Sequence, residues 1–335
     1  MQVRPFRDGD LERLQETVAA WIAQAGRCAY DHIGELAHRI YDNLRGRPIG
    51  DLVSIWEEAT GVVGVAIVGR FGNAFDVFTA PTHRGSDVEL EMVRHAAELT
   101  ERMTREEWVL TDVFDCETTR MRLLEQLGFA RFRVWDRVTE RSLGQEEPPP
   151  DPAVPEGFLV RSATYDDAEH LAIARNLCFG QDWTGSQYRT GFMEKTPGRE
   201  IVAQAPDGRI AAFTVYWTDP LNRIGHFEPV GTHPEFRRRG LARAVMLQAM
   251  REMAEAGMRR VTVNHAADNT SAGRLYSSLG FTVAHETYGY RRLGDDYASP
   301  EALSTRRAPS YRRLVTGWEA EPAHASSTAR RLAQR

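Results

Sequence analysis

Cysteine is scarce in this chain, with only Cys28, Cys116 and Cys178 among 335 residues. Because the three are far apart and odd in number, the sequence predicts neither a disulfide framework nor a zinc site, and it favours a reducing compartment. An apolar run of 18 residues is also absent, so no membrane-spanning helix is predicted. The first residues are polar and charged, unlike a signal peptide, and we therefore expect a cytoplasmic protein with no membrane partner.

The chain also lacks an excess of positive charge. The formal net charge is −5 and the sequence pI is near 6.1, which argues against broad nucleic-acid binding. Hydrophobic residues make up 42% of the chain and charged residues 27%, as is typical of globular proteins. A length of 335 residues suggests two domains of ordinary size.

The composition changes abruptly at residues 142–157, which contain five prolines and three glutamates. Such a segment cannot form a core element, so we interpret it as a semi-rigid linker. It separates a first domain, residues 1–141, from a second, residues 158–296. We expect residues 297–335 to be a C-terminal extension whose last part is disordered, because it is rich in Ala, Ser and Arg.

The two predicted domains repeat one pattern. Four landmarks recur in the same order at offsets of 147 to 157 residues, which indicates a duplicated domain. The landmark pairs are Arg4 and Arg161, Gly61 and Gly208, Pro81 and Pro234, and Gly128 and Gly280. Each copy reads as a strand, a helix, several strands, a turn, a helix, a strand, a helix and a strand. The predicted fold class is therefore α/β, with a central mixed sheet flanked by helices in each of two tandem domains.

Val230 to Ala242 is the most informative stretch. It predicts the end of a strand, a turn with three arginines and Gly240, and the start of an amphipathic helix. Free N–H groups at a helix N-terminus beside arginines form a site for a phosphate or pyrophosphate. The stretch is therefore interpreted as an anion-binding cradle.

Two motifs in the second copy carry a family resemblance. Arg237-Arg-Arg-Gly-Leu-Ala242 matches Arg/Gln-x-x-Gly-x-Gly/Ala, and the segment from Asn269 to Phe281 matches Asn-x-x-Ala-x-x-Leu-Tyr-x-x-x-Gly-Phe. Together they resemble the GCN5-related N-acetyltransferase (GNAT) superfamily, clearly over residues 159–292 and faintly over 1–141. The tandem arrangement is similar to that of two-domain members such as the mycothiol synthases.

The resemblance implies acetyl-CoA as the donor and a small-molecule or peptide amine as the acceptor. It places the pyrophosphate on the turn and first helical residues, the pantetheine arm along the preceding strand, and an asparagine beside that arm. One strand N–H would also stabilise the oxyanion formed during transfer. The implied donor-binding residues are Val230, Gly231, Thr232, Arg237, Arg238, Arg239, Gly240, Leu241, Ala242, Arg243 and Asn269.

Acetyl transfer to an amine requires a base, and an acid favours departure of the thiolate. His226 and Glu228 lie two apart on one predicted strand, so their side chains share a face. The resemblance implies a base at either position. We favour Glu228 slightly, and the alternative for each residue is that it merely orients the substrate. By the same resemblance, Tyr276 would be the acid.

Other candidates are assigned structural roles. His265 is interpreted as a loop histidine after a strand, and Cys178 as a core residue, since the family attacks the thioester directly. Trp183, Tyr188 and Trp217 lie in segments that could line the acceptor pocket. No metal ligand set is predicted.

The first copy has a damaged cradle. Its turn at Arg84 and Gly85 is shorter, Asp87 and Glu89 would repel a pyrophosphate, and Leu124 replaces the tyrosine. We therefore expect residues 1–141 to be a degenerate, non-catalytic domain that walls the acceptor site or stabilises the fold.

The prediction is an N-acetyltransferase, monomeric or homodimeric, active in its second domain. Two alternatives stay open. One is a non-catalytic acyl-CoA sensor or scaffold, and the other is different acyl-CoA chemistry on the same fold, such as hydrolysis or decarboxylation.

Overall fold

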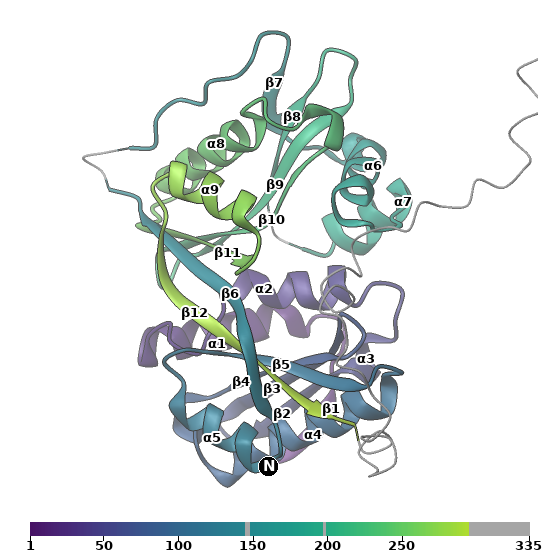
Figure 1. Ribbon diagram of the computed structural model, residues 1–335, viewed down its shortest axis with the longest axis vertical. Coiled ribbons are helices and arrows are strands. Elements are labelled where there is room, and N and C mark those ends of the chain that lie inside the picture. The colour runs from purple at the N-terminus through teal and green to yellow at the C-terminus, as the bar shows by residue number, and fades with distance from the viewer. Residues whose placement is uncertain (145–147, 197–198, 295–335) are drawn as a thin grey trace, which may run out of the picture.

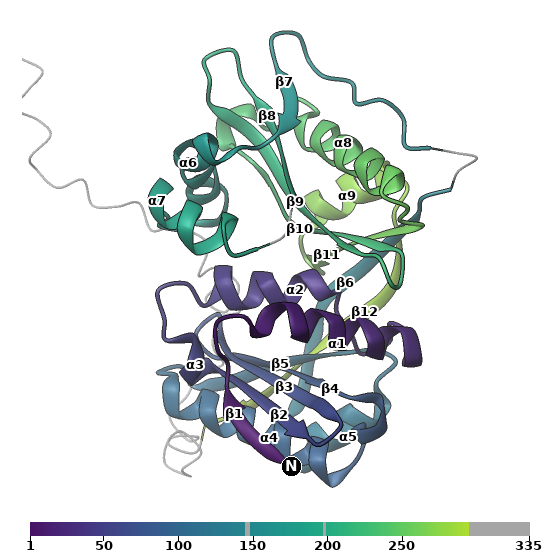
Figure 2. The ribbon, with the colours of Figure 1, turned by 180° about the vertical axis from the view of Figure 1, so that it is seen from behind.

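A single mixed sheet runs through the whole protein. The structure, a computed structural model, describes residues 1–144, 148–196 and 199–294. Its twelve strands follow the order β1-β2-β3-β4-β5-β12-β6-β11-β10-β9-β8-β7. Helices flank this sheet, and the two halves of the chain lie at its two ends (Figures 1 and 2). The predicted α/β class with a mixed sheet is confirmed.

The first half contains six strands and seven helical segments in its described residues. The strands are β1 (Gln2–Pro5), β2 (Val53–Glu58), β3 (Gly61–Arg70), β4 (Ala74–Thr79), β5 (Trp108–Phe114) and β6 (Ala130–Ser142). The helical segments are α1 (Asp10–Ala25), α2 (Ile33–Ala37), η1 (His38–Asn43), α3 (Ile49–Leu52), η2 (Pro81–His83), α4 (Asp87–Met103) and α5 (Thr118–Gln126).

The second half repeats this order in its described residues. The strands are β7 (Leu159–Ser162), β8 (Arg199–Gln204), β9 (Ile210–Asp219), β10 (Ile224–Thr232), β11 (Arg260–Ala266) and β12 (Thr282–Leu293). The helical segments are η3 (Tyr165–Asp167), α6 (Ala168–Phe179), α7 (Gly185–Tyr188), η4 (Arg189–Met193), η5 (Pro234–Phe236), α8 (Leu241–Glu255) and α9 (Thr270–Ser278).

The repeat extends to individual ion pairs. In the first half, Arg4 on β1 pairs with Asp10 at 2.7 Å, and in the second, Arg161 on β7 pairs with Asp167 at 2.7 Å. Each arginine ties the opening strand of its half to the start of the following helical segment. The same contact at corresponding positions agrees with the duplication seen in the sequence.

The last strand of each half is exchanged with the other half. β6 pairs with β11 through residues 136–142, and β12 pairs with β5 through residues 287–293. β6 and β12 also pair with each other, antiparallel, at the centre of the sheet. Figure 1 shows both strands running from one half into the other. The two sheets expected from the sequence are therefore one sheet, because local strand patterns do not specify which neighbour a strand pairs with.

The first half packs directly against the second through α2. Every residue of α2 is buried, and a Cβ built on Gly34 would lie 2.2 Å from Cγ of Trp217 on β9. No larger residue fits there without movement, so this glycine permits the close approach. One apolar cluster accordingly includes residues of both halves, among them Leu36, Phe192 and Trp217.

The predicted boundary segments are only partly described. Residues 143–144 and 148–158 contain no helix or strand, whereas Ser142, the first residue of the predicted linker, is the last residue of β6, and Leu143 is buried. The extension predicted at residues 297–335 lies outside the described residues. Within the described part of the chain, no helix is both long and apolar enough to cross a membrane.

One prediction from cysteine spacing is wrong. Cys28, after α1, forms a disulfide with Cys116, before α5, across a sequence separation of 88 residues. Spacing along the chain could not reveal this pairing, because the fold alone brings the two loops together. Cys178 remains a free thiol. It is partly buried and packs against the core, and burial raises the pKa of its thiol to about 11.

This disulfide predicts a thiol count and a stability change. Ellman titration of the unfolded, non-reduced protein should find one thiol, and none in a Cys178→Ser control. Cys28→Ser should lower the free energy of unfolding by about 2–4 kcal/mol, because it removes a cross-link that closes a long loop. Urea denaturation measures the change. Three titratable thiols in the wild type, or equal stability with and without reductant, would contradict the assignment.

Candidate active site

The turn before α8 has the geometry of an anion cradle. Arg238 and Gly240 both have positive φ, 64° and 80°, and nothing lies within 4 Å of a Cβ built on Gly240. Glycine is therefore favoured at position 240 because of the positive φ of the backbone, and not because neighbouring atoms would clash with a side chain. The N–H of Ala244 donates to the oxygen of Gly240 at 3.0 Å. The N–H groups between Gly240 and Ala244 lie in the first helical turn and have no acceptor within the helix. They can therefore donate to another acceptor.

The arginines around this turn are not neutralised. Arg237, Arg238 and Arg239 are exposed, and none of them has an ion pair with a carboxylate in the described part of the chain. Arg243, in the first turn of α8, donates to the oxygen of Ser278 at 2.8 Å. Unpaired guanidinium groups and free N–H groups at a helix N-terminus suit a pyrophosphate.

The corresponding turn of the first half already contains an anion. Gly85 has φ 75°, and its N–H donates to the carboxylate of Glu89, which is 0% exposed. Arg120 pairs with the same carboxylate, and Arg84 is bound to Glu117 at 3.1 Å. The turn is therefore filled by a side chain of its own helix, α4. The sequence comparison named Glu89 as a repulsive charge, and the structure shows it bound within the turn.

Strand β10 separates from β11 beside this turn. Their parallel pairing covers Ile224–Phe227, and the register of β10 against β9 shifts between Phe227 and Val230. The N–H of His233 donates to Ala211 of β9 at 2.9 Å. Since N–H directions alternate in an antiparallel ladder, the N–H groups of Val230 and Thr232 point away from β9. That of Thr232 contacts the Cys178 thiol.

Glu228 lies at the point of separation and faces the first half. Its carboxylate is 3.3 Å from Nε2 of His38 on η1, and its main-chain oxygen accepts a hydrogen bond from the indole of Trp217 at 3.1 Å. Burial raises the pKa of Glu228 well above its ordinary value, and the nearby carboxylates of Glu35 and Asp42 add to the increase. Its proton is therefore held up to higher pH than that of an ordinary glutamic acid.

His38 connects Glu228 to a buried ion pair. Its Nδ1 is 3.2 Å from Asp42, and Asp42 pairs with Arg175 of α6 at 2.8 Å. Burial lowers the pKa of His38, so its imidazole is neutral near pH 7. Burial by itself would raise the pKa of Asp42, but Arg175, His38 and Arg45 together lower it. The arrangement is a chain of carboxyl, imidazole, carboxylate and guanidinium groups; its two ends, Glu228 and Arg175, lie in the second half and its two middle groups lie in the first.

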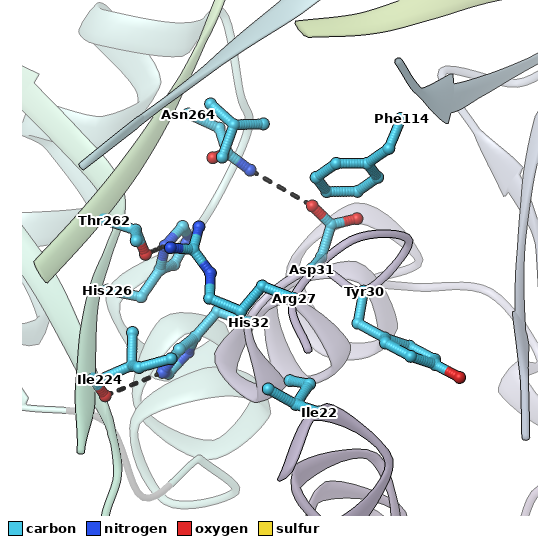
Figure 3. A pocket seen from close by; sticks show the side chains of 11 residues that line it. Ile22, Arg27, Tyr30, Asp31, His32, Phe114, Ile224, His226, Thr262 and Asn264 are labelled. Carbon is cyan, nitrogen blue, oxygen red and sulfur yellow. Dashed lines mark hydrogen bonds between the residues drawn. The ribbon is translucent and has the colours of Figure 1, made fainter. Parts of the chain in front are cut away.

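His226 shares the face of Glu228 but lies deeper. It is 1% exposed, with Nδ1 2.8 Å from the Thr262 hydroxyl and Nε2 3.1 Å from Glu35. His32 stacks on it at 5.1 Å between ring centroids. Figure 3 shows this region, where His32 bonds to the main chain of Ile224 across the junction of the halves. The surrounding space is about 10 Å³, too small for an acceptor.

Tyr276 is buried on α9, with its ring 5.6 Å from that of His265. Burial raises the pKa of its phenol, and the charge of Glu228 adds to the increase, so the hydroxyl keeps its proton at neutral pH. His265 was expected in a loop but lies within β11, where it lines the cavity described below. Its backbone position is therefore corrected.

The remaining predicted residues have identifiable contacts. Asn269 is the N-cap of α9, and its side chain accepts from the N–H of Ala272 at 3.1 Å. Trp183 is buried against Tyr188, whose hydroxyl bonds to Glu200. Trp217 touches the main chain of Glu228. Among the described residues, none of these three aromatic side chains lines the cavity beside Glu228.

That cavity, here called the central cavity, is about 270 Å³ in volume and lies where the halves meet. The first half supplies Glu35, His38, Arg39, Asp42, Asn43, Arg70, Phe71 and Asp136, and the second half supplies Phe179, Gln181, Glu228, Pro229, Asn264, His265 and Ala266. Sequence reasoning missed every residue of the first half. The available signal was the ionisable set Glu35, His38 and Asp42 at helical spacing in an otherwise apolar segment.

Three groups beside the cavity are close enough to share a metal ion. One ligand atom each of Glu35, His226 and Glu228 lie within 4.8 Å of one another. Two carboxylates and an imidazole are plausible ligands for a divalent metal. In the described residues, Arg39 lies 3.3 Å from Glu35 and balances the charge of that carboxylate. The His226 ring is held by a hydrogen bond with the Thr262 hydroxyl. No metal ligand set was predicted at this position.

Comparison with known proteins adds independent evidence. Residues 168–281 match the acetyltransferase (GNAT) family. The chain is 26% identical over 259 residues to a mycothiol acetyltransferase of Saccharomonospora viridis, covering 69% of this chain and 80% of that protein. It is 25% identical to the mycothiol acetyltransferase of Kocuria rhizophila over the same shares of the two chains.

Solved structures share the fold along most of the chain. A GCN5-related N-acetyltransferase from Sphaerobacter thermophilus superposes with a TM-score of 0.56 at 22% identity, covering 87% of this chain and 95% of that one. A tandem GNAT protein of the clavulanic acid biosynthesis pathway gives 0.59 at 16% identity, with 88% and 98% covered. Taken with the motifs at Arg237–Ala242 and Asn269–Phe281, these matches identify the chain as a tandem acyltransferase of the GNAT acetyltransferase family.

Proposed function

We propose that this protein transfers an acetyl group from acetyl-CoA to a primary amine, with the donor on the second half and the acceptor in the central cavity. The observation that carries the proposal is the contrast between the two related turns. The turn before α8 has unpaired arginines and free N–H groups, whereas Glu89 fills the turn before α4. We therefore assign no donor to the first half and give it a role in walling the acceptor site.

The residues of the second half fit the donor along its length. The N–H groups at the start of α8, with Arg237, Arg238 and Arg239, would bind the pyrophosphate. Where β10 separates from β11, the edge of β10 that faces away from β9 would form hydrogen bonds with the pantetheine arm. The Val230 N–H lies on this edge. This path leads from the turn to Glu228, so the thioester would reach the cavity.

Glu228 and Tyr276 would handle the protons. The acceptor ammonium gives one proton to the Glu228 carboxylate, and the free amine attacks the thioester carbonyl carbon. The Val230 N–H would stabilise the developing oxyanion. The C–S bond then breaks, the thiolate takes the Tyr276 proton, and the second amine proton restores the phenol. One proton is released overall, from the Glu228 carboxyl group, which restores the carboxylate for the next turnover.

Loss of the cradle should abolish donor binding. Gly240→Glu places a carboxylate at the N-terminus of α8, and we expect at least a tenfold weaker acetyl-CoA affinity by calorimetry, because like charges repel. Gly85→Glu is the matched control, since Gly85 also has positive φ in the related turn. Its affinity should equal that of the wild type. Equal binding by both variants would remove the cradle assignment, and circular dichroism would verify that both are folded.

Removing the phenol proton should slow turnover and leave binding intact. Tyr276→Phe keeps the ring in its buried site, so we expect kcat to fall roughly 100-fold or more with little change in acetyl-CoA affinity. Tyr290→Phe, a buried tyrosine on β12, serves as control. Steady-state release of CoA measures both. An unchanged kcat in Tyr276→Phe would exclude its role as the acid.

The raised pKa of Glu228 predicts the direction of the pH dependence. A base must be deprotonated to act, so kcat/KM should rise with pH through the range above the ordinary glutamate pKa and level off only when Glu228 has ionised. Glu228→Gln should lose most activity together with this rise. A profile already flat from pH 5 upward, or an unchanged one in the variant, would exclude Glu228 as the base.

Acyl-CoA hydrolysis is the alternative that the same assay separates. Release of CoA at an equal rate with and without an amine would favour hydrolysis, because the proposed reaction needs the acceptor. Binding of acetyl-CoA with no release under any condition would favour a sensor.

A further inference from the structure

The central cavity has more carboxyl groups than its own cations pair with. Four carboxylates line it: Glu35, Asp42, Asp136 and Glu228. Glu35 pairs with Arg39 at 3.3 Å, and Asp42 pairs with Arg175 at 2.8 Å. These two carboxylates are therefore neutralised by residues of the protein itself.

Within the part of the chain that the structure describes, the other two carboxyl groups form no ion pair with an arginine or a lysine. In the described residues, the Asp136 carboxylate has neither an ion pair nor a hydrogen bond, and the only ion-pair contact of Glu228 is with His38. Burial raises the pKa of Asp136 to about 7, the nearby carboxylate of Asp112 adds to the increase, and Arg70 opposes it. A positive charge supplied from outside would find in Asp136 a carboxylate that has no ion pair within the described residues.

The two arginines that line the cavity do not supply that charge. Arg39 is held by Asp31 at 2.7 Å and by Asp76 at 3.2 Å, as well as by Glu35. Arg70 pairs with Asp76 and Asp112. Asp31, Asp76 and Asp112 lie outside the cavity lining. Both guanidinium groups are thus engaged by other carboxylates, Arg39 by Glu35 of the lining and by two aspartates behind it, and neither forms an ion pair with Asp136 in the described residues.

Apolar surface accompanies these carboxylates. Phe71 lines the cavity with 55% of its surface exposed, and Phe179 lines it from the second half. An aromatic face attracts cations and also packs against methylene groups. A volume of about 270 Å³ is close to the lower end for ligand sites, so the occupant is small.

We propose that the acceptor is a small aliphatic molecule with two cationic nitrogens, of which Glu228 deprotonates one and Asp136 binds the other. This inference rests on the proposed function, since it names the acceptor class for the same site. Phe71 and Phe179 contact the hydrocarbon between the two nitrogens. The second nitrogen stays charged throughout and contributes binding energy without entering the chemistry.

A matched pair of acceptors tests the proposal. With the intact protein and acetyl-CoA, 1,4-diaminobutane should have a kcat/KM about 10- to 100-fold above that of butylamine, the advantage expected of one charged hydrogen bond. Asp136→Asn should reduce this ratio toward one, because it removes the partner of the second ammonium. Asp151→Asn, an exposed carboxylate paired with Arg251 outside the cavity, should leave the ratio unchanged.

The outcomes separate this inference from the function on which it rests. Equal use of the two amines, or a ratio that Asp136→Asn does not alter, would overturn the acceptor class and leave the acetyltransferase standing. Acetylation of amines that lack a second cation, but not of the diamine, would also overturn the acceptor class and leave the acetyltransferase standing. Stoichiometric metal that survives dialysis, held by Glu35, His226 and Glu228, would contradict the proposed function instead, because it would occupy the carboxylate assigned as the base. Failure to acetylate any primary amine would contradict the proposed function itself.

Discussion

The exchange of β6 and β12 between the halves is the constraint on which the rest of the structure depends. Each strand is paired on both sides with strands of the other half, so the two copies cannot separate without breaking sheet hydrogen bonds. Because the sheet is continuous, α2 and η1 of the first half are held against β9 and β10 of the second. This contact brings His38 to 3.3 Å from Glu228, although the two residues are 190 positions apart in the sequence.

The two copies differ at the same turn, and the first copy also contributes to the cavity between the halves. In the first half, Glu89 and Arg120 form a buried pair where the second half leaves an open turn, so the vacant site has become part of the core. The same half supplies the histidine and carboxylates that face Glu228. Burying so many charges is costly unless they are paired. The pairs formed by Arg39, Arg70 and Arg175 offset this cost and leave Asp136 and Glu228 available to a substrate.

The sequence was sufficient to predict local structure, which depends on residues close together in the chain. Periodicity located most helices and strands to within a few residues, and the motif at Arg237–Ala242 identified the turn, because Gly240 and its arginines act through neighbouring backbone. The sequence was insufficient to predict which distant strands and cysteines pair with each other. Nothing near Cys28 points to Cys116, and nothing in β6 specifies β11 as its partner. The acceptor side of the site was missed for the same reason, since its residues come from the half that had lost the motif.

A crystal structure with bound CoA would test the central claim most directly, namely that the second half alone binds the donor and delivers it to the cavity between the halves. The account predicts the pyrophosphate on the N–H groups at the start of α8, the thiol end beside Glu228, and no CoA at the start of α4. A CoA molecule bound at the turn of Gly85, or a thiol end directed away from the central cavity, would contradict it.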